Sequence, residues 1–339
     1  YMPLCLLLQE KNETMLKLIA DSGSTKTDWT LLGEEGGVLG TCHSQGLNPY
    51  HLSGEQITQV LADEVIPSLL ISGEKQRQLG DAPKPSIVIY FYGSGVTDAM
   101  IPKMERLLVA SFSACGFLVA VEAHAASDML GAARALLGHE SGIAVILGTG
   151  SNSCYYDGGS IVRGVPPLGY VLGDEGSGTA IGKAFFRLIY RNPKAASLRE
   201  KFEAWSGKDY AAVIERIYRQ PLANTYLASV STFVGEHLSS LSAQEHLSQD
   251  EQIEKKLLSA MLHQVYGDFC REILSFYAQL ADGAKEDSEM PSSVKVGFVG
   301  SIAHYFHDEI ANALHELGFQ MGEVLKSPME GLIRYHAGY

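Results

Sequence analysis

Two apolar segments that flank a short glycine and hydroxyl turn, near the start of the chain, constrain its fold most strongly. The first segment, Leu16–Ala20, ends in Asp21, and the second, Thr27–Leu32, follows the turn Ser22–Lys26. This pattern predicts a β-hairpin with a carboxylate at the base of its turn. The amides and hydroxyls of such a turn can hold a phosphate, and the carboxylate can hold a hydrated Mg²⁺. The segment is not a Walker A loop, because the GxxxxGK[ST] pattern is missing. A plain hairpin turn is the alternative, since Gly-Ser turns are common in hairpins.

A second glycine turn repeats this design about 125 residues later. The apolar run Gly142–Leu147 leads into the turn Gly148–Ser151, and the strand-like segment Ser153–Tyr156 follows. Two phosphate-binding turns of this kind suggest two similar half-molecules that face one nucleotide. Each turn would then hold one end of the triphosphate.

Composition limits the partners that such a protein can have. The chain has 339 residues, which suits two domains, and its formal net charge is −13. Nucleic acid and anionic membranes require basic surfaces, so neither is expected as the main partner. The five cysteines are scattered and form no CxxC pair, which fits reduced thiols in the cytoplasm. No apolar stretch reaches the roughly 20 residues that span a bilayer.

The order of predicted elements describes two α/β halves. In the first half we expect strands at Leu16–Ala20, Thr27–Leu32, Gly37–Cys42, Ser86–Tyr92 and Phe117–Glu122, helices at Ser53–Leu70, Lys103–Cys115 and Ser127–Leu137, and a loop at Ser72–Pro85. In the second half we expect strands at Ile143–Leu147, Ser153–Tyr156, Ser160–Gly164, Val294–Val299 and Met321–Lys326, helices at Ile302–Leu317 and Gly331–Ala337, and helices through most of Ser177–Ala284.

These elements predict two domains and a short leading segment. Residues 15–138, together with about 325–339, would form the first domain. Residues 139–324 would form the second, with a helical insertion at about 178–284. The status of residues 1–14 stays open, because an extension, an artefact and a misassigned start are all consistent with the sequence.

Five sequence blocks resemble the N-acetylglucosamine kinase and BadF-type ATPase family of the sugar kinase/Hsp70/actin superfamily. The blocks are Asp21–Asp28, Gly46–Pro49, Asp128, Gly148–Asn152 with Gly173–Ser177, and Gly297–Ser301. Each block alone is weak to moderate evidence, whereas their order and spacing together are specific. The resemblance runs from about Leu16 to the end of the chain. It implies an α/β fold of two RNase H-like (actin-like ATPase) domains, each βββαβα, with a nucleotide cleft between them.

The resemblance further implies transfer of a phosphoryl group from ATP to a hydroxyl, the 6-OH, of an amino sugar. Asp21 would hold Mg²⁺ through water, and Asp128 would be the catalytic base that orients the sugar hydroxyl and accepts its proton. An ordinary helix-capping aspartate is the alternative for Asp128. The residues that would contact ATP are Gly23, Ser24, Thr25, Lys26, Gly148, Thr149, Gly150, Ser151, Gly300, Ser301 and Gly331.

Other positions match the sugar-binding elements of the family, namely Asn48, Asn152, Leu168, Gly169 and Asp174. An asparagine amide suits sugar hydroxyls because it both donates and accepts hydrogen bonds. An Asn-Pro turn and a glycine loop before a helix are the structural alternatives. The family carries Trp at the position of Leu168 and Gly at Pro166 and Pro167, on the acetamido side of the sugar. This departure puts recognition of the N-acetyl group in question and leaves hexose binding intact.

Two other functions compete with a kinase. A BadF-type ATPase that activates a partner enzyme would need cysteines near Gly173–Ser177 to ligate an iron–sulfur cluster, and none is there. A sugar or nucleotide sensor would be expected to lose Asp21, Asp128 or the glycine turns, and all of them are present. A homodimer is expected by analogy with the family only.

Overall fold

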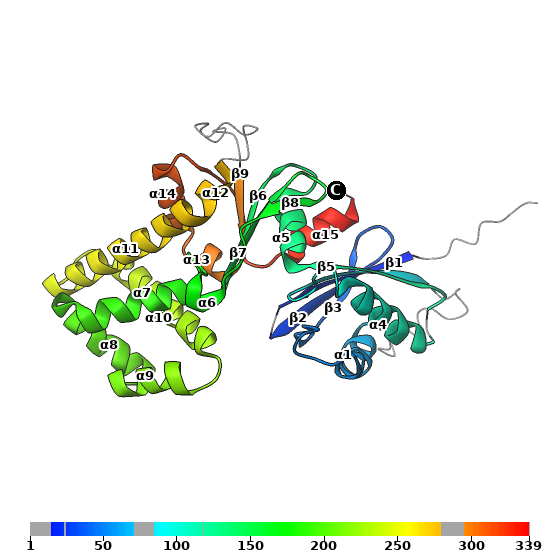
Figure 1. Ribbon diagram of the computed structural model, residues 1–339, viewed down its shortest axis with the longest axis horizontal. Coiled ribbons are helices and arrows are strands. Elements are labelled where there is room, and N and C mark those ends of the chain that lie inside the picture. Colours follow the sequence, from blue (N-terminus) through cyan, green and yellow to red (C-terminus); the bar gives the residue numbers. More distant parts are fainter. Residues whose placement is uncertain (1–14, 24, 71–84, 117, 279–294, 339) are drawn as a thin grey trace, which may run out of the picture. The chain divides into compact units, whose positions relative to one another are not determined.

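The computed structural model describes residues 15–23, 25–70, 85–116, 118–278 and 295–338 (Figure 1). These residues divide into two compact units: the first runs up to Gly131 and resumes at Leu332, and the second is Ala132–Gly331. Several sequence predictions lie outside the described residues, namely those for residues 1–14, Ser24, the loop at 72–84, Phe117 and the end of the helical insertion at 279–284.

The first unit is built on a five-stranded sheet with the order β3-β2-β1-β4-β5. Strand β2 pairs antiparallel with both β1 and β3, whereas β4 pairs parallel with β1 and with β5. The elements are β1 (Met15–Ser22), β2 (Lys26–Leu32), β3 (Val38–Gln45), α1 (Gly54–Val60), the π-helical turn η1 (Leu61–Val65), α2 (Ile66–Leu70), β4 (Ser86–Gly93), α4 (Ile101–Ala114), β5 (Val121–Ser127) and the start of α5 (Asp128–Leu137).

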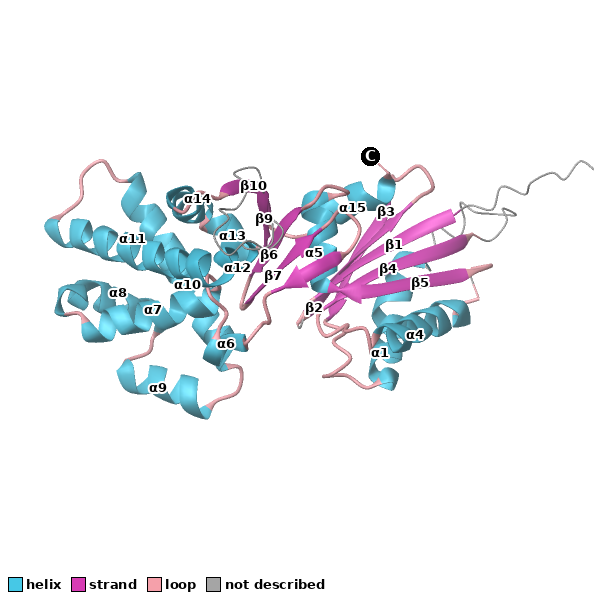
Figure 2. Ribbon diagram, turned by 45° about the horizontal axis from the view of Figure 1, so that its top comes forward, coloured by secondary structure: helices cyan, strands magenta, loops and turns pink. Residues whose placement is uncertain are grey.

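The second unit repeats this topology in a sheet with the order β10-β9-β6-β7-β8 (Figure 2). Its elements are β6 (Gly142–Leu147), β7 (Ser151–Tyr156), β8 (Ile161–Gly164), α6 (Gly169–Leu172), α7 (Gly178–Arg191), the 3₁₀ turn η2 (Pro193–Ala195), α8 (Ala196–Ser206), α9 (Tyr210–Arg219), α10 (Ala223–Ala243), α11 (Gln249–Phe269), the π-helical turn η3 (Cys270–Leu274), α12 (Ser275–Ala278), β9 (Lys295–Val299), α13 (Ser301–Tyr305), α14 (His307–Glu316) and β10 (Gln320–Leu325). The last helix, α15 (Met329–Ala337), begins in the second unit and ends in the first. The two-domain α/β architecture predicted from the sequence is confirmed, and each half extends the predicted βββαβα order by a fifth strand.

The central strand of the first sheet explains why its sequence is apolar. Leu18, Ile19 and Ala20 of β1 are fully buried, because β1 lies between β2 and β4 and both of its faces are covered. Helix α1 begins where the sequence supplies a cap, because Ser53 forms a capping box with Gln56.

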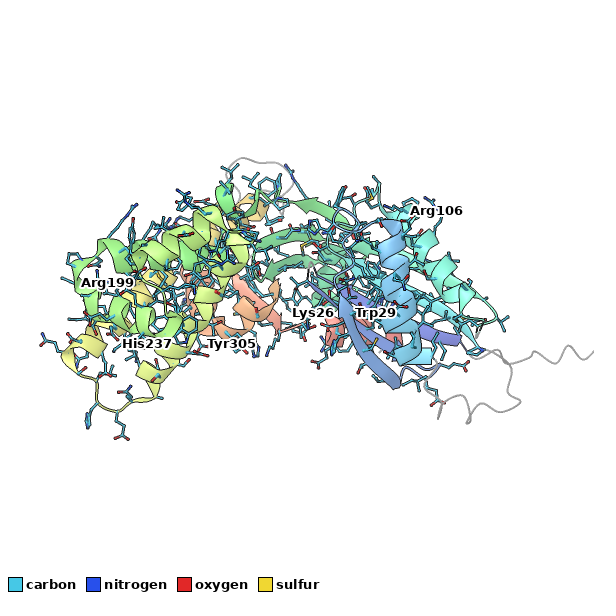
Figure 3. The ribbon with its side chains drawn as sticks, turned by 90° about the horizontal axis from the view of Figure 1, so that it is seen from below. Lys26, Trp29, Arg106, Arg199, His237 and Tyr305 are labelled. Atoms are coloured by element: carbon cyan, nitrogen blue, oxygen red, sulfur yellow. The ribbon has the colours of Figure 1, made fainter. Side chains whose placement is uncertain are left out.

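The helical insertion is organised around one buried carboxylate. Glu254 on α11 is 1% exposed and accepts hydrogen bonds from Ser197 and Lys201 on α8 and from His237 on α10. The three distances lie between 2.7 and 2.8 Å. Figure 3 labels His237 among these helices. The pKa of Glu254 lies below its ordinary value, because burial raises it but the hydrogen bonds lower it more.

The end of the chain returns to the first unit through α15. The ammonium group of Lys17 on β1 donates a hydrogen bond of 2.6 Å to the carbonyl of His336. The ring of His336 stacks on Tyr90 at a centroid distance of 3.8 Å, and its Nε2 lies 2.8 Å from the Tyr92 hydroxyl. These contacts pack α15 against β1 and β4.

Two predicted elements are wrong in detail. The strand expected at 117–122 is β5, which begins at Val121 and pairs with β4 as far as Ser127 opposite Gly93. Its alanine, glutamate and histidine residues have low strand propensity, so backbone pairing with β4 decides its position. The helix expected at 302–317 is interrupted at Phe306, which is 2% exposed and packs into the core beside Tyr266.

Among the described helices, none combines the length and the apolar character that crossing a bilayer requires.

Candidate active site

The first turn closes the β1–β2 hairpin as the sequence predicts. The amide of Gly23 donates to the carbonyl of Lys26 at 2.9 Å, and Asp21 on β1 lies opposite Asp28 on β2. The ammonium group of Lys26 is exposed and lies 2.9 Å from the Asp28 carboxylate, which also contacts His43 at 2.5 Å. The turn therefore places Lys26 beside the aspartates Asp21 and Asp28. Contacts of Gly23, Thr25 and Lys26 with a phosphate stay a prediction.

A hydroxyl pair that the sequence reasoning missed supports this turn from behind. Ser22 and Thr27 are buried, and their hydroxyl oxygens lie 2.8 Å apart. The hydroxyl of Ser22 also accepts a hydrogen bond of 3.0 Å from the amide of Leu47. The alternation of side chains along β1 and β2 could have identified both hydroxyls, because they fall on the buried face. This pair ties the turn to the segment that carries Asn48.

Asp21 is a partly buried carboxylate in acidic surroundings. Burial first, and then the negative charges of Asp28 and Asp128, raise its pKa to about 7, against the opposing charge of Lys26. A carboxylate whose charge is disfavoured in this way is stabilised by a bound cation. Among the described residues no group of three or more His, Cys, Asp or Glu side chains could hold a metal ion. Proteins commonly bind Mg²⁺ through one or two carboxylates together with waters and substrate phosphates, so a role for Asp21 in holding Mg²⁺ stays a prediction.

Asp128 lies directly after β5 and begins α5. The hydroxyl of Ser127 accepts a hydrogen bond from the amide of Leu130 at 3.2 Å, so Ser127 takes the capping position and Asp128 does not. The Asp128 carboxylate accepts from the amide of Met129 at 2.8 Å. Burial raises its pKa above the ordinary value, and this amide contact opposes the rise. Asp128 is therefore a half-buried carboxylate at a helix start whose capping role is taken by its neighbour, and its role as a base stays a prediction.

The carboxylates of Asp21 and Asp128 lie at the same end of the sheet, where the parallel strands end. Asp21 pairs in register with Tyr92 of β4, and Tyr92 pairs with Ala126 of β5, two positions before Asp128. Because β1, β4 and β5 run parallel, Asp21 and Asp128 both lie at the carboxyl ends of these strands, and the backbones of β1 and β5 are roughly 10 Å apart with β4 between them.

Asn48 is buried, and its side chain forms part of the local turn. Its amide oxygen accepts from the amide of Tyr50 at 2.9 Å. A β carbon at Gly95, which has a φ of +78°, would lie 2.5 Å from this oxygen, so only glycine leaves room for the Asn48 side chain. These contacts correspond to the Asn-Pro turn considered from the sequence, and a sugar contact stays a prediction.

The second turn is fastened to the beginning of α7. The carbonyl of Gly148 accepts a hydrogen bond from the amide of Gly178 at 2.9 Å. The carbonyl of Thr149 accepts from the amide of Thr179 at 3.2 Å and also from its hydroxyl. Ser177 caps α7, as predicted, by accepting from the amide of Ala180. The hydrogen bonds thus fix the turn relative to a helix N-terminus.

Asp174 connects this turn to the wall of a pocket. It has a left-handed backbone, with a φ of +62°, and its carboxylate accepts from the amide of Ser151 at 3.3 Å. A β carbon at Gly150 would lie 2.9 Å from the same carboxylate. Burial raises the pKa of Asp174, whereas the Ser151 amide and the Lys183 charge lower it. A non-glycine residue in this conformation is uncommon and often marks a functional position.

The pocket of the second unit has a volume of about 180 Å³ and collects three of the predicted sugar-binding residues. Its lining residues are Ser151, Asn152, Ser153, Val165, Pro166, Pro167, Leu168, Leu172, Asp174, Glu175, Phe269, Glu272 and Ile273. Of the predicted set within this unit, Gly169 does not line it. Phe269, Glu272 and Ile273 were missed because they lie about 100 residues further along the chain, and only tertiary packing places them here.

The glycines predicted to contact adenosine pack against backbone. Gly300 has a φ of +126°, and a β carbon there would lie 2.1 Å from the carbonyl oxygen of Leu147, while Ser301 begins α13. A β carbon at Gly331 would lie 2.2 Å from the carbonyl oxygen of Ala135 on α5. Close packing accounts for both glycines, so their contact with adenosine stays a prediction.

Burial also limits the chemistry of two cysteines. Cys154 and Cys270 are buried, and burial raises the pKa of each thiol to about 12. Neither side chain supplies a thiolate at neutral pH, which is the form that ligates metals and iron–sulfur clusters.

Two solved structures are similar to this chain over nearly their whole lengths. A candidate N-acetylglucosamine kinase from Porphyromonas gingivalis is 34% identical, with a TM-score of 0.72, and the match covers 95% of this chain and 98% of that one. A candidate N-acetylglucosamine kinase from Chromobacterium violaceum is 19% identical, with a TM-score of 0.61 and the same coverage, and supports the fold alone. No known family profile matches the chain, nor does any curated protein sequence.

Proposed function

Because the chain belongs to the N-acetylglucosamine kinase and BadF-type ATPase family of the sugar kinase/Hsp70/actin superfamily, we propose that it is an ATP-dependent sugar kinase. It transfers a phosphoryl group to the 6-OH of an amino sugar such as N-acetylglucosamine or glucosamine. The observation that carries this proposal is the pair of carboxylates at one sheet edge, Asp21 and Asp128, each with a raised pKa.

Asp128 is the proposed catalytic base. A phosphoryl acceptor needs a carboxylate that orients its hydroxyl and accepts the proton late in the transfer. The contact between Met129 and Asp128 keeps one carboxylate oxygen fixed, and burial raises the pKa of Asp128, which favours acceptance of a proton by this carboxylate. Ser127 supports this role because it takes over the helix cap.

ATP is the proposed phosphoryl donor, with Mg²⁺ as its cation. When bound, Mg²⁺ would neutralise charge on the phosphates, and Asp21 would hold it through water. The hairpin turn Gly23–Lys26 and the turn Gly148–Ser151 would supply amides and hydroxyls to phosphate oxygens. The fixed attachment of the second turn to α7 supports this assignment, because a binding turn must keep its amides oriented.

The pocket of the second unit is the proposed sugar site. Asn152 and Asp174 offer polar groups to hydroxyls, and Leu168, Phe269 and Ile273 offer an apolar wall. An apolar wall can contact the face of a pyranose ring or the methyl of an acetamido group, so the pocket is compatible with both candidate sugars.

The test is ADP release from Mg·ATP with a panel of acceptors. The panel contains N-acetylglucosamine, glucosamine, N-acetylmuramic acid, N-acetylmannosamine, glucose and no sugar. We expect release to rise with an amino sugar and to be low without one. Hydrolysis that is independent of sugar would contradict the proposal and favour an ATPase that activates a partner protein. No release under any condition would favour a sensor.

The position of transfer needs a second substrate comparison. The 6-deoxy analogue of the best acceptor should support no ADP release, because it lacks the accepting hydroxyl. Release with the 6-deoxy analogue at the rate of the parent sugar would assign the phosphate to another hydroxyl while retaining the kinase activity.

A further inference from the structure

The short helix α6 forms part of the pocket wall but has almost no packing of its own. It has four residues, and none of them is buried. Leu172 is 74% exposed, and Leu168, which precedes the helix, is 60% exposed, although both line the pocket. Leu168 occupies the N-cap position of α6, and its side chain makes no capping hydrogen bond. A helix of one turn is not stable in water by itself, so contacts from outside must hold it.

Lys183 provides such a contact from α7. Its ammonium group donates to the carbonyl of Tyr170 at 2.8 Å and to the carbonyl of Gly173 at 3.3 Å. Both carbonyls lie at the C-terminal end of α6, where a cation is favourable to the helix dipole and to carbonyls without partners within the helix. The helix that carries Lys183 is fixed at its N-terminus, because Ser177 caps α7 and the first two residues of α7 donate hydrogen bonds to the second turn.

The charges around Lys183 are consistent with a fixed cation. Burial lowers the pKa of Lys183, and the carboxylates of Asp174 and Glu175 raise it again. Asp174 and Glu175 both line the pocket, and the Lys183 charge lowers the pKa of Asp174. The Lys183 ammonium group therefore both binds the carbonyls of Tyr170 and Gly173 and lowers the pKa of Asp174 in the pocket lining.

We propose that Lys183 is a positioning residue that holds α6 in place, so that Leu168, Leu172 and Asp174 form the sugar pocket. This inference rests on the proposed function, because the pocket is taken as the sugar site. Lys183 acts on substrate affinity through α6 and does not contact the reacting groups. Its removal therefore weakens sugar binding and leaves the phosphoryl donor and the turnover of bound sugar nearly unaffected.

The experiment compares wild type with Lys183→Met, Lys183→Arg and Lys256→Met. Methionine keeps the stem of Lys183 and removes the donors, whereas arginine keeps a cation that can reach the carbonyls. Lys256 is exposed on α11 and serves as the matched control. Hydrogen exchange is followed at residues 168–174, which include the Gly173 amide bonded to the Gly169 carbonyl at 2.8 Å. The KM for sugar, the KM for ATP and kcat are measured in parallel.

For Lys183→Met we expect about tenfold faster exchange at residues 168–174 and about a tenfold higher KM for sugar, because the charge-assisted hydrogen bonds to the Tyr170 and Gly173 carbonyls are lost. The KM for ATP and kcat should stay within about twofold of wild type. Lys183→Arg should recover most of both effects, and Lys256→Met should resemble wild type.

Unchanged exchange in Lys183→Met would overturn the inference, and so would faster exchange with an unchanged KM for sugar. A fall in kcat together with a higher KM for both substrates would indicate general structural damage and would also overturn it. A wild-type protein that phosphorylates no sugar would refute the proposed function. The exchange comparison would still decide in that case whether Lys183 holds α6.

Discussion

Replacing Asp21 by Asn should stabilise the protein at neutral and alkaline pH while it weakens Mg·ATP binding. The Asp21 carboxylate is partly buried and lies near the negative charges of Asp28 and Asp128, so its ionised form is disfavoured in the folded state. Asparagine has nearly the same shape and cannot ionise. The variant therefore keeps the packing of β1 and avoids the buried charge.

The magnitude and its pH dependence follow from the pKa. The pKa of Asp21 rises from 3.8 to about 7 on folding, and each pKa unit corresponds to about 1.4 kcal/mol, which gives a ceiling of about 4 kcal/mol. Because Asp21 keeps some solvent contact, we expect about 1–3 kcal/mol. A raised pKa means that the neutral carboxyl supports stability below about pH 4, and this support is lost as the pH rises through about 7. The Asp21→Asn variant keeps this stability at all pH values, because its amide does not ionise.

The assay is the thermal unfolding midpoint of both proteins from pH 4 to pH 8.5 without nucleotide. The midpoint of Asp21→Asn should match wild type near pH 4 and exceed it by roughly 3–8 °C above pH 7.5. Addition of Mg·ATP should then raise the wild-type midpoint more than that of the variant. Asp98→Asn, at an exposed position of the same unit, should change neither. A constant difference at all pH values, or a less stable variant at pH 8, would refute the reasoning.

Three further variants test other parts of the molecule. Asp128→Asn should lower turnover by about 10²–10⁴-fold while ATP binding, measured by calorimetry, persists. In the wild type, kcat should fall as the pH drops through the raised pKa of Asp128. Turnover of Asp128→Asn near that of the wild type would rule out Asp128 as the base. Glu254→Gln should lower the free energy of unfolding, measured in urea at pH 7, by about 2 kcal/mol, because charge-assisted hydrogen bonds weaken. Since the pKa of Glu254 is lowered in the folded state, the difference between wild type and variant should shrink in acid. An equal difference at pH 3 and pH 7 would contradict this. Gly331→Ala should lower the unfolding free energy by about 1–3 kcal/mol with or without ADP, because its β carbon would meet the carbonyl of Ala135, whereas Gly37→Ala, where a β carbon has open space, should not.

The parts of the fold with strong local signals could be predicted from the sequence. The hairpin turn after Asp21, the cap at Ser177 and the helix start at Asp128 all follow from residue types whose backbone preferences are local. The strand β5 could not be placed, because its residues favour no strand and the hydrogen bonds to β4 fix it. The break at Phe306 was missed for a similar reason, since burial of one ring outweighs helix continuity.

Part of the pocket lining could be predicted from the sequence. Asn152 comes from one sequence block and Leu168 and Asp174 from a later one, and the structure brings the three residues around one pocket. Two further lining residues, Phe269 at the end of α11 and Glu272 on η3, have no local pattern that links them to those blocks. Lys183 was not singled out either, because a lysine on a helix is an ordinary surface residue until its backbone partners are known.

The return of α15 to the first unit has a consequence for synthesis on the ribosome. Lys17 and His336 are partners separated by 319 positions, and the whole second unit, about 200 residues, is translated between the two parts of the first. At roughly 5–20 residues per second, the nascent sheet of β1–β5 waits on the order of 10–40 s for its last helix. During this interval the faces of Tyr90 and Tyr92 that later meet His336 lack that partner. The second unit is continuous and can fold in the meantime, so truncation after Gly331 should harm the first unit more than the second.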